Sequence, residues 1–240
     1  MNTKIKSVIC LTVVCGSLLI LAISCKKENN DPGTVTDIDG NVYHTITIGT
    51  RVWFKENLRT TKFKDGSEIQ PVTEKAAWVT LTTPGYCWYE NNVANKTIYG
   101  GLYNGYAVKE SSGLCPTGWH VATDADWVDM EMAFGLPQAQ AYITGDRGEA
   151  ENVGGHLKDL QHWDAPNSGA DNSSGFSALG TGYRRDTGDF EWLGQWAGFY
   201  TSTAPDASHL FQRYLGYDEV GVARLVYPLT YGYSIRCVKD

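Results

Sequence analysis

The stretch "CPTGWHVATDADW" (residues 115–127) places a cysteine, a histidine, two aspartates and two tryptophans within thirteen positions. Inside it, Thr123 is followed three residues later by Asp126, just before apolar residues at helical spacing. This is a capping-box arrangement in which Asp replaces the usual Glu or Gln. We therefore expect a helix that begins at Thr123 and is ended by Gly135 and Pro137.

The same stretch could instead supply an active site, with Asp124 and Asp126 as an acid–base pair. Residues two positions apart on a helix do not face each other, which disfavours that use. A zinc site at His120 is not indicated, because the chain has neither a Cys-x-x-Cys nor a His-Glu-x-x-His spacing. A Gly-x-Ser-x-Gly elbow and a phosphate-binding loop are also missing from the sequence. We interpret the stretch as a folding junction.

Outward from this junction, the pattern is mostly that of strands. Residues 42–54 alternate apolar and polar side chains around Gly49 and Thr50, which predicts a β-hairpin. Residues 99–108 place apolar side chains on one helical face and predict a short helix. Short apolar runs separated by Gly, Asp and Pro fill the second half and predict an antiparallel strand series. The expected class is α+β, with short antiparallel sheets, one or two short helices and long loops.

The first residues have the pattern of an export signal. Lys4 and Lys6 precede an apolar run, so we expect residues 1–24 to be a signal peptide. "LAISC" resembles the lipobox of bacterial lipoproteins, which predicts that Cys25 is lipidated; a plain signal anchor and soluble secretion are the alternatives. Residues 25–36 have the composition of a flexible tether. We expect one domain at residues 37–240.

Charge and cysteine content narrow the class further. The chain has 27 acidic and 20 basic side chains, a formal net charge of −7, so nucleic acid is not an expected partner. Outside the signal and Cys25, the cysteines are Cys87, Cys115 and Cys237. An exported protein folds where disulfides persist, so one bridge and one leftover thiol are expected. The residues alone leave the pairing open.

Five blocks in fixed order resemble the signature blocks of the Fibrobacter succinogenes major paralogous domain, a family of exported proteins and lipoproteins of Bacteroidetes and Fibrobacteres. They are "IGTRVWFKENLRTTKFKDGSEI", "YGGLYNGYAV", "CPTGWHVATDADW", "GFSALGTGYR" and "GYSIRCVKD". The departures are Ala122, where the family tends to have Pro, and "ALGTGYR" in place of "ALPGGYR". The resemblance covers most of the expected domain.

Within these blocks, "VATDADW" is similar to the "LPTEAEW" helix start of formylglycine-generating, sulfatase-modifying enzymes, and "GYSIRCV" to their last strand. This likeness implies a C-type-lectin-like fold in which the first helix and the last strand are close and often joined by a disulfide. It therefore implies the pair Cys115 and Cys237. Those enzymes use two cysteines late in the domain, whereas Cys237 is the only cysteine after Cys115. We expect no enzyme activity of that kind.

The expected function is that of a binding module for carbohydrate or another extracellular polymer. Lectin-like folds present long loops, and the chain has eight Trp and 14 Tyr. Trp163, Trp192 and Trp196 are flanked by polar loop residues and are the candidates for stacking on a sugar ring. The simpler interpretation is that most of these aromatic residues form the core.

Other functions remain open at this stage. Asp164, Asn167, Asp171 and Asn172 offer oxygen ligands for calcium, although the same residue types also form turns and the lectin Glu-Pro-Asn or Gln-Pro-Asp triplets are missing. No other cofactor is expected. The alternative to glycan binding is a structural envelope component or adhesin that contacts proteins. A hydrolase requires carboxylates from distant segments to converge. The expected location is the cell envelope, as an outer-membrane lipoprotein held by its lipid and facing the periplasm or the outside.

Overall fold

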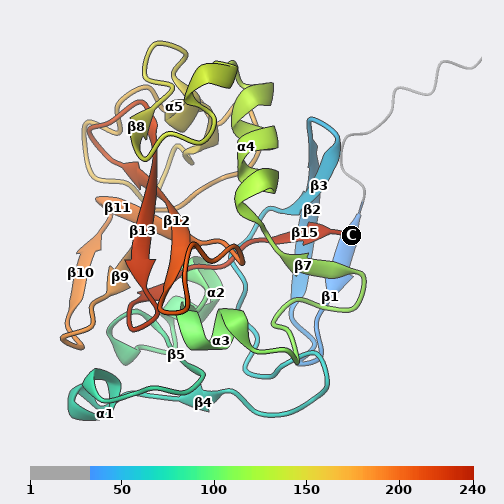
Figure 1. The fold of residues 1–240 in the computed structure, drawn as a ribbon, viewed down its shortest axis with the longest axis vertical. Coiled ribbons are helices and arrows are strands. Elements are labelled where there is room, and N and C mark those ends of the chain that lie inside the picture. Colours follow the sequence, from blue (N-terminus) through green and yellow to red (C-terminus); the bar gives the residue numbers. More distant parts are fainter. Residues whose placement is uncertain (1–32) are drawn as a thin grey trace, which may run out of the picture.

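A computed structural model describes residues 33–240 (Figure 1). The expected signal peptide at residues 1–24 and the lipidation site Cys25 lie outside the described residues. Residues 34–36, expected to belong to the tether, form β1 (Thr34–Thr36) and pair with β2 (Val42–Ile48), so the sheet begins before Asp37. In the part of the chain that the structure describes, no helix has the length and hydropathy needed to cross a membrane.

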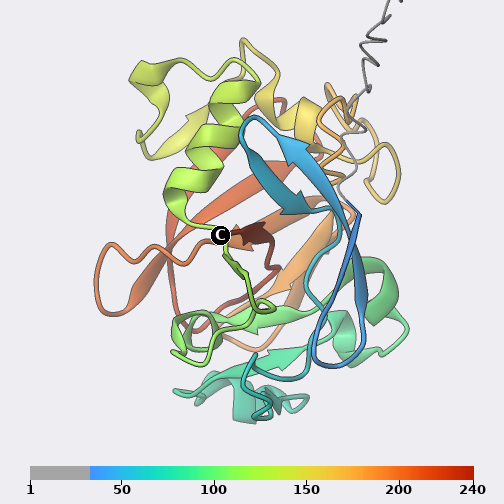
Figure 2. The same ribbon diagram turned by 90° about the vertical axis from the view of Figure 1, so that its right-hand side faces the viewer.

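A five-stranded sheet brings both ends of the domain together. Its order is β1-β2-β3-β15-β7, with β3 at Arg51–Phe54, β7 at Trp119–Val121 and β15 at Cys237–Lys239. The β2–β3 pair confirms the predicted hairpin, and Gly49 in its turn has a φ of +59°, a conformation that favours glycine. Figure 2 shows this hairpin in front, with the C-terminus beside the start of the long helix.

A larger sheet fills the other side of the molecule. Its order is β4-β5-β6-β14-β9-β11-β12-β13-β8, and β10 pairs with β9 outside this path. Most neighbours are antiparallel, as expected, but β4–β5 and β9–β11 are parallel pairs. The strands are β4 (Gln70–Pro71), β5 (Gly85–Cys87), β6 (Leu102–Asn104), β8 (Gly145–Arg147), β9 (Thr181–Arg184), β10 (Phe190–Leu193), β11 (Trp196–Tyr200), β12 (His209–Gly216), β13 (Val222–Pro228) and β14 (Gly232–Tyr233).

The expectation of one or two helices is wrong, because the described residues contain five α-helices. They are α1 (Lys75–Val79), α2 (Asn95–Tyr99), α3 (Gly105–Lys109), α4 (Asp124–Ala133) and α5 (Val153–Leu157), with 3-10 turns η1 (Tyr89–Asn91) and η2 (Gln138–Gln140). All except α4 have five residues, too few to give an amphipathic repeat, so tertiary packing rather than pattern stabilises them. The coarse class, mostly short strands with a few helices, is α+β as expected.

The single helix expected at residues 99–108 is divided into three parts. Tyr99 ends α2, β6 follows, and α3 begins after Asn104. Gly100 has a φ of +76°, and a Cβ there would lie 2.7 Å from the Asn57 side chain, so the chain cannot continue as a helix at this point. The Asn104 side chain then accepts a hydrogen bond from Ala107 N at 2.9 Å and caps α3.

The helix predicted from the opening stretch is α4, and its capping box is present. Thr123 Oγ1 accepts a hydrogen bond from Asp126 N at 3.1 Å, and Asp126 Oδ2 accepts one from Thr123 N at 2.9 Å. These two bonds satisfy backbone donors that the first turn of a helix leaves without intrahelical partners. Gly135, with a φ of +97°, lies just beyond the end of the helix, as expected.

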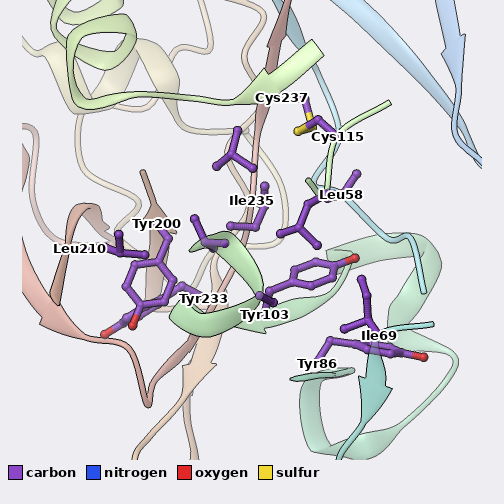
Figure 3. Close-up of a cluster of buried hydrophobic side chains, with 14 of the residues drawn as sticks. Leu58, Ile69, Tyr86, Tyr103, Cys115, Tyr200, Leu210, Tyr233, Ile235 and Cys237 are labelled. Atoms are coloured by element: carbon purple, nitrogen blue, oxygen red, sulfur yellow. A yellow bond between two sulfur atoms is a disulfide. The ribbon is translucent and has the colours of Figure 1, made fainter. Parts of the chain in front are cut away.

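The predicted disulfide joins Cys115 and Cys237, whose Cα atoms are 5.9 Å apart. Both cysteines are buried in a core cluster that also contains Tyr103, Tyr200 and Tyr233 (Figure 3). The bridge ties the segment before β7 to β15, so it reinforces the pairing of these two neighbouring strands in the five-stranded sheet. The remaining cysteine of the domain, Cys87, is a buried free thiol.

Candidate ligand-binding site

The face of the large sheet over β11, β12 and β13 is lined with aromatic side chains. Side chains alternate between the two faces of a strand, so each strand sends every second residue to this face. The strand register places Gly198 opposite Tyr214 and Gln212 opposite Leu225. The residues between them, among them Phe199 and Leu215, point to the other side and pack in the second core cluster.

A small cavity of about 70 Å³ lies on this face. Its lining consists of Tyr183, Trp196, Gly198, Gln212, Tyr214, Leu225, Tyr227 and Tyr233. Trp196, Leu225 and Tyr227 are half-buried and form the part of the lining that reaches the surface. A Cβ at Gly198 would lie 2.4 Å from the Tyr233 ring and 2.6 Å from Gln212 Nε2, so glycine is needed for both side chains to pack directly on β11.

Gln212 is the one amide in the cavity lining. Its side chain is only 2% exposed, and among the described residues its Oε1 has no hydrogen-bond partner. A buried acceptor without a partner costs about 1–3 kcal/mol. A donor group entering the cavity, from a ligand or from water, would remove that cost. The cavity therefore combines apolar rings with a polar group that lacks a partner.

Trp192 lies at the surface beside this cavity and stacks on Trp196. The two ring centroids are 5.1 Å apart with an interplanar angle of 14°, and Trp192 is 44% exposed. Trp192 has a φ of +66°, which is uncommon for a large side chain, and its carbonyl accepts a hydrogen bond from Gln195 N in the turn to β11. The turn holds the outer indole parallel to the inner one.

Glu191 holds the side chains around this tryptophan pair. Its Oε2 accepts hydrogen bonds from Trp192 Nε1 at 3.0 Å and from the Tyr183 hydroxyl at 3.2 Å, and its Oε1 lies 3.2 Å from Arg185 Nη1. Burial and then the Glu191 charge raise the pKa of Tyr183, so its phenol stays protonated and can donate. These contacts orient the exposed indole.

Trp163 does not belong to this arrangement. It is half-buried, packs against the second core cluster, and donates from Nε1 to the Ala178 carbonyl at 2.8 Å. The Lys158 ammonium lies 5.5 Å from its ring centroid. Of the three tryptophans singled out from sequence, the structure therefore brings Trp192 and Trp196 together and directs the indole N–H of Trp163 to the backbone. Ligand binding by any of them stays a prediction.

The four candidate calcium ligands are engaged with separate partners. Asp164 accepts from Gln195, Asn167 donates to the Asp159 carbonyl, Asp171 lies 2.9 Å from His156, and Asn172 bonds Ser177. Within residues 33–240, no group of three or more His, Cys, Asp and Glu side chains is arranged to hold a metal ion. Gathering the four around one cation would break these hydrogen bonds, so they do not form a ready-made calcium site.

The carboxylates of the opening stretch also have separate partners. Asp124 pairs with Arg213 at 2.7 Å and with Arg224 at 2.8 Å, while Asp126 caps α4 and lies 3.0 Å from His120 Nε2. Burial raises the pKa of Asp124, but the two arginines outweigh it and hold that pKa below its ordinary value. Asp124 is therefore charged at neutral pH and belongs to a buried ion-pair network, which supports the interpretation as a folding junction.

Sequence reasoning did not identify most of the cavity residues. Tyr183, Gln212, Tyr214, Tyr227 and Tyr233 were placed only within strands. The spacing Trp-x-Gly in β11 and Gln-x-Tyr in β12 was a usable signal, because it puts these side chains on one face. Contacts between strands far apart in the chain decide which face stays open, and they leave Gln212 Oε1 without a partner among the described residues.

A family model described as the Fibrobacter succinogenes major domain matches residues 46–239. This range contains almost all of the five blocks that carry the resemblance, the disulfide and the aromatic cavity, and it leaves out β1 and the start of β2. Neither the curated proteins nor the solved structures gave a match to the chain.

Proposed function

The chain belongs to the Fibrobacter succinogenes major domain family, and from this premise we propose that it is a non-enzymatic binding module for a carbohydrate chain. The observation that carries the proposal is the exposed Trp192, stacked on Trp196 beside an aromatic cavity. The apolar face of a sugar ring packs well on a fixed indole, and hydroxyl groups can reach polar side chains at its edge. Here Glu191, which accepts a hydrogen bond from Trp192 Nε1, is such a side chain.

The proposal includes a C-type-lectin-like fold and export as a lipid-anchored protein. The pairing of β15 with β3 and β7 near the start of α4, and the bridge between Cys115 and Cys237, support the fold, because the implied arrangement joins the first helix to the last strand. A disulfide in the domain is in keeping with export. In this proposal, a lipid on Cys25 anchors the protein to a membrane of the cell envelope.

The absence of formylglycine-type chemistry is also part of the proposal. Cys237 is bonded to Cys115, so it is not free to act with a second cysteine. Cys87 is buried, and burial raises the pKa of its thiol to about 12, which keeps it protonated and unreactive. No two free cysteines lie among the described residues.

The test is a binding screen of the purified full-length protein against immobilised polysaccharides, with the variant Trp192→Ala. Removing the exposed indole should weaken binding about tenfold or more, in line with the value of an aromatic stacking contact plus the area it covers. Tyr142→Ala is the matched control, because Tyr142 is also an exposed aromatic residue. Its ring lies beside the Arg224 guanidinium, and the Arg224 side chain is on the face of β13 that points away from the cavity.

Equal losses in both variants, unchanged binding by Trp192→Ala, or no binding to any polysaccharide would each contradict the proposal. Capture of an envelope protein that depends on Trp192, without polysaccharide binding, would favour the structural or adhesin role.

A further inference from the structure

We propose that the cavity between Trp196, Tyr214 and Tyr227 receives a protonated primary amine, and that the carbohydrate is therefore an amino-sugar polymer with free amino groups. This inference rests on the proposed function for the polymer, and it adds the chemical group that the cavity selects. The cavity walls, the charges beside them and Gln212 Oε1, which has no partner among the described residues, support it.

The walls suit a small cation. Five of the eight lining residues are Tyr or Trp, and the cavity volume of about 70 Å³ is that of a small group rather than a whole sugar ring. The faces of aromatic rings carry negative potential and attract an ammonium group within about 6 Å of the ring centre. The rings are held in place by one another, since Trp196 contacts Tyr214 at 4.5 Å and Tyr183 at 5.9 Å between centroids.

The charges beside the cavity are mostly acidic. A Cβ at Gly216 would lie 2.9 Å from the Tyr214 hydroxyl oxygen and 3.1 Å from Glu219 Oε2, which places this phenol and this carboxylate next to each other. Burial and then the charges of Glu219, Asp218 and Asp146 raise the pKa of Tyr214. On the other side, Glu191 accepts from the Tyr183 hydroxyl. A cation gains from this potential and an anion does not.

The basic groups nearby are already engaged. Arg185 pairs with Glu191 at 3.2 Å. The Lys158 ammonium is buried and donates to the carbonyls of Ser168, Gly216 and Glu219, at 2.7–2.9 Å. It partly offsets the Glu219 charge, but burial and then three other carboxylates, Asp146, Asp218 and Glu149, keep the pKa of Glu219 raised.

The orphaned acceptor distinguishes a primary amine from other cations. Gln212 Oε1 is buried in the cavity lining and has no partner among residues 33–240, so it favours a group that donates a hydrogen bond. An ammonium group carries three donors, whereas a quaternary ammonium carries none. Acetylation of the amine removes its positive charge and places a carbonyl oxygen toward the rings, so an N-acetylated sugar is disfavoured. The free amine of a hexosamine meets both requirements, while its ring lies outside, beside Trp192.

The experiment measures binding of four probes by calorimetry with the full-length protein, at mildly acidic pH. The probes are a glucosamine hexamer, an N-acetylglucosamine hexamer, cellohexaose and Nα-acetyl-lysine methyl ester. We expect the glucosamine hexamer to bind at least about tenfold more tightly than the acetylated and neutral hexamers, the factor expected of one charge-assisted hydrogen bond. The preference should fall when the pH is raised and the amine loses its proton.

Gln212→Met keeps the side-chain length and removes the acceptor. It should lower the affinity for the glucosamine hexamer about tenfold, without changing the affinity for cellohexaose and without lowering the melting temperature, because the orphaned acceptor is removed too. Trp192→Ala should weaken all three hexamers alike. Should Gln212→Met fail to fold, Glu219→Gln tests the same preference by removing the neighbouring charge, and it should reduce the discrimination between the first two hexamers.

Equal affinity for the three hexamers would overturn the amine inference and leave the carbohydrate module intact. No binding to any hexamer would also overturn the amine inference, and together with no binding in the polysaccharide screen it would remove the proposed function itself. Tight binding of the lysine ester alone would overturn the amino-sugar source and identify the partner as a protein side chain.

Discussion

Among single residues, Asp124 shows most clearly how a candidate for catalysis becomes a structural group. Its carboxylate lies between Arg213 and Arg224, and Glu131 joins the same network through Arg213 and Arg147. All five side chains are buried and connect α4 to β12, β13 and β8. The sequence placed Asp124 in the first turn of a helix, but the two arginines come from strands about ninety to a hundred residues later.

The pH dependence of stability follows from this network. A carboxylate whose pKa is lowered in the folded state stabilises it above the unfolded pKa of about 4, and that stabilisation is lost as the pH falls through the folded value. Asp124→Asn should therefore lower the free energy of unfolding at neutral pH by about 3–5 kcal/mol, the cost of breaking a buried pair. It should also make stability fall less steeply below pH 4 than in the wild type. Urea unfolding across this pH range measures both effects.

Asp129→Asn is the control for this substitution, because Asp129 lies on the same helix with its carboxylate half-exposed. Its stability should stay within about 0.5 kcal/mol of the wild type. Parallel acid profiles for Asp124→Asn and the wild type would contradict the role given to Asp124.

At the level of elements, local signals succeeded where the partners are neighbours in sequence. The start of α4 was predicted because Thr123 and Asp126 lie three residues apart and bond to each other. The hairpin of β2 and β3 was predicted because a tight turn joins its strands. Residues 99–108 were assigned wrongly, since the close approach of Asn57 to Gly100 decides their conformation and is not visible in the pattern.

The cap of α4 gives a prediction at this level. Thr123→Ala removes the side-chain acceptor for Asp126 N and should lower the free energy of unfolding by about 1 kcal/mol. Thr123→Ser keeps the hydroxyl and should retain most of that stability. Chemical denaturation of the three proteins at neutral pH gives the comparison, and equal losses for Ala and Ser would show that packing of the Thr123 methyl group matters more than the cap.

For the molecule as a whole, the disulfide is the main covalent constraint within the described residues. It joins positions 122 residues apart and connects the segment before β7 to the last strand. Such a long loop is worth on the order of 4–5 kcal/mol in the chain-entropy model. The double variant Cys115→Ala, Cys237→Ala should therefore be less stable by several kcal/mol, and its urea midpoint should not respond to a reductant.

Cys87→Ala provides the matched control, because it removes the free thiol and leaves the bridge in place. Its urea midpoint should still drop when a reductant is added, as in the wild type. A wild-type midpoint that is the same with and without reductant would contradict a stabilising bridge.

The sequence by itself determined the α+β class, the positions of many of the strands along the chain, the helix start at Thr123 and, through resemblance, the disulfide. These features depend on residues within a few positions of one another or on motifs that keep their order. Only the tertiary structure decided that Trp192 stacks on Trp196, that Trp163 turns inward, and that Gln212 faces four tyrosines without a partner. The physical reason is that strand order and register determine which side chains meet, and β9 and β14 enter this site from segments about fifty residues apart.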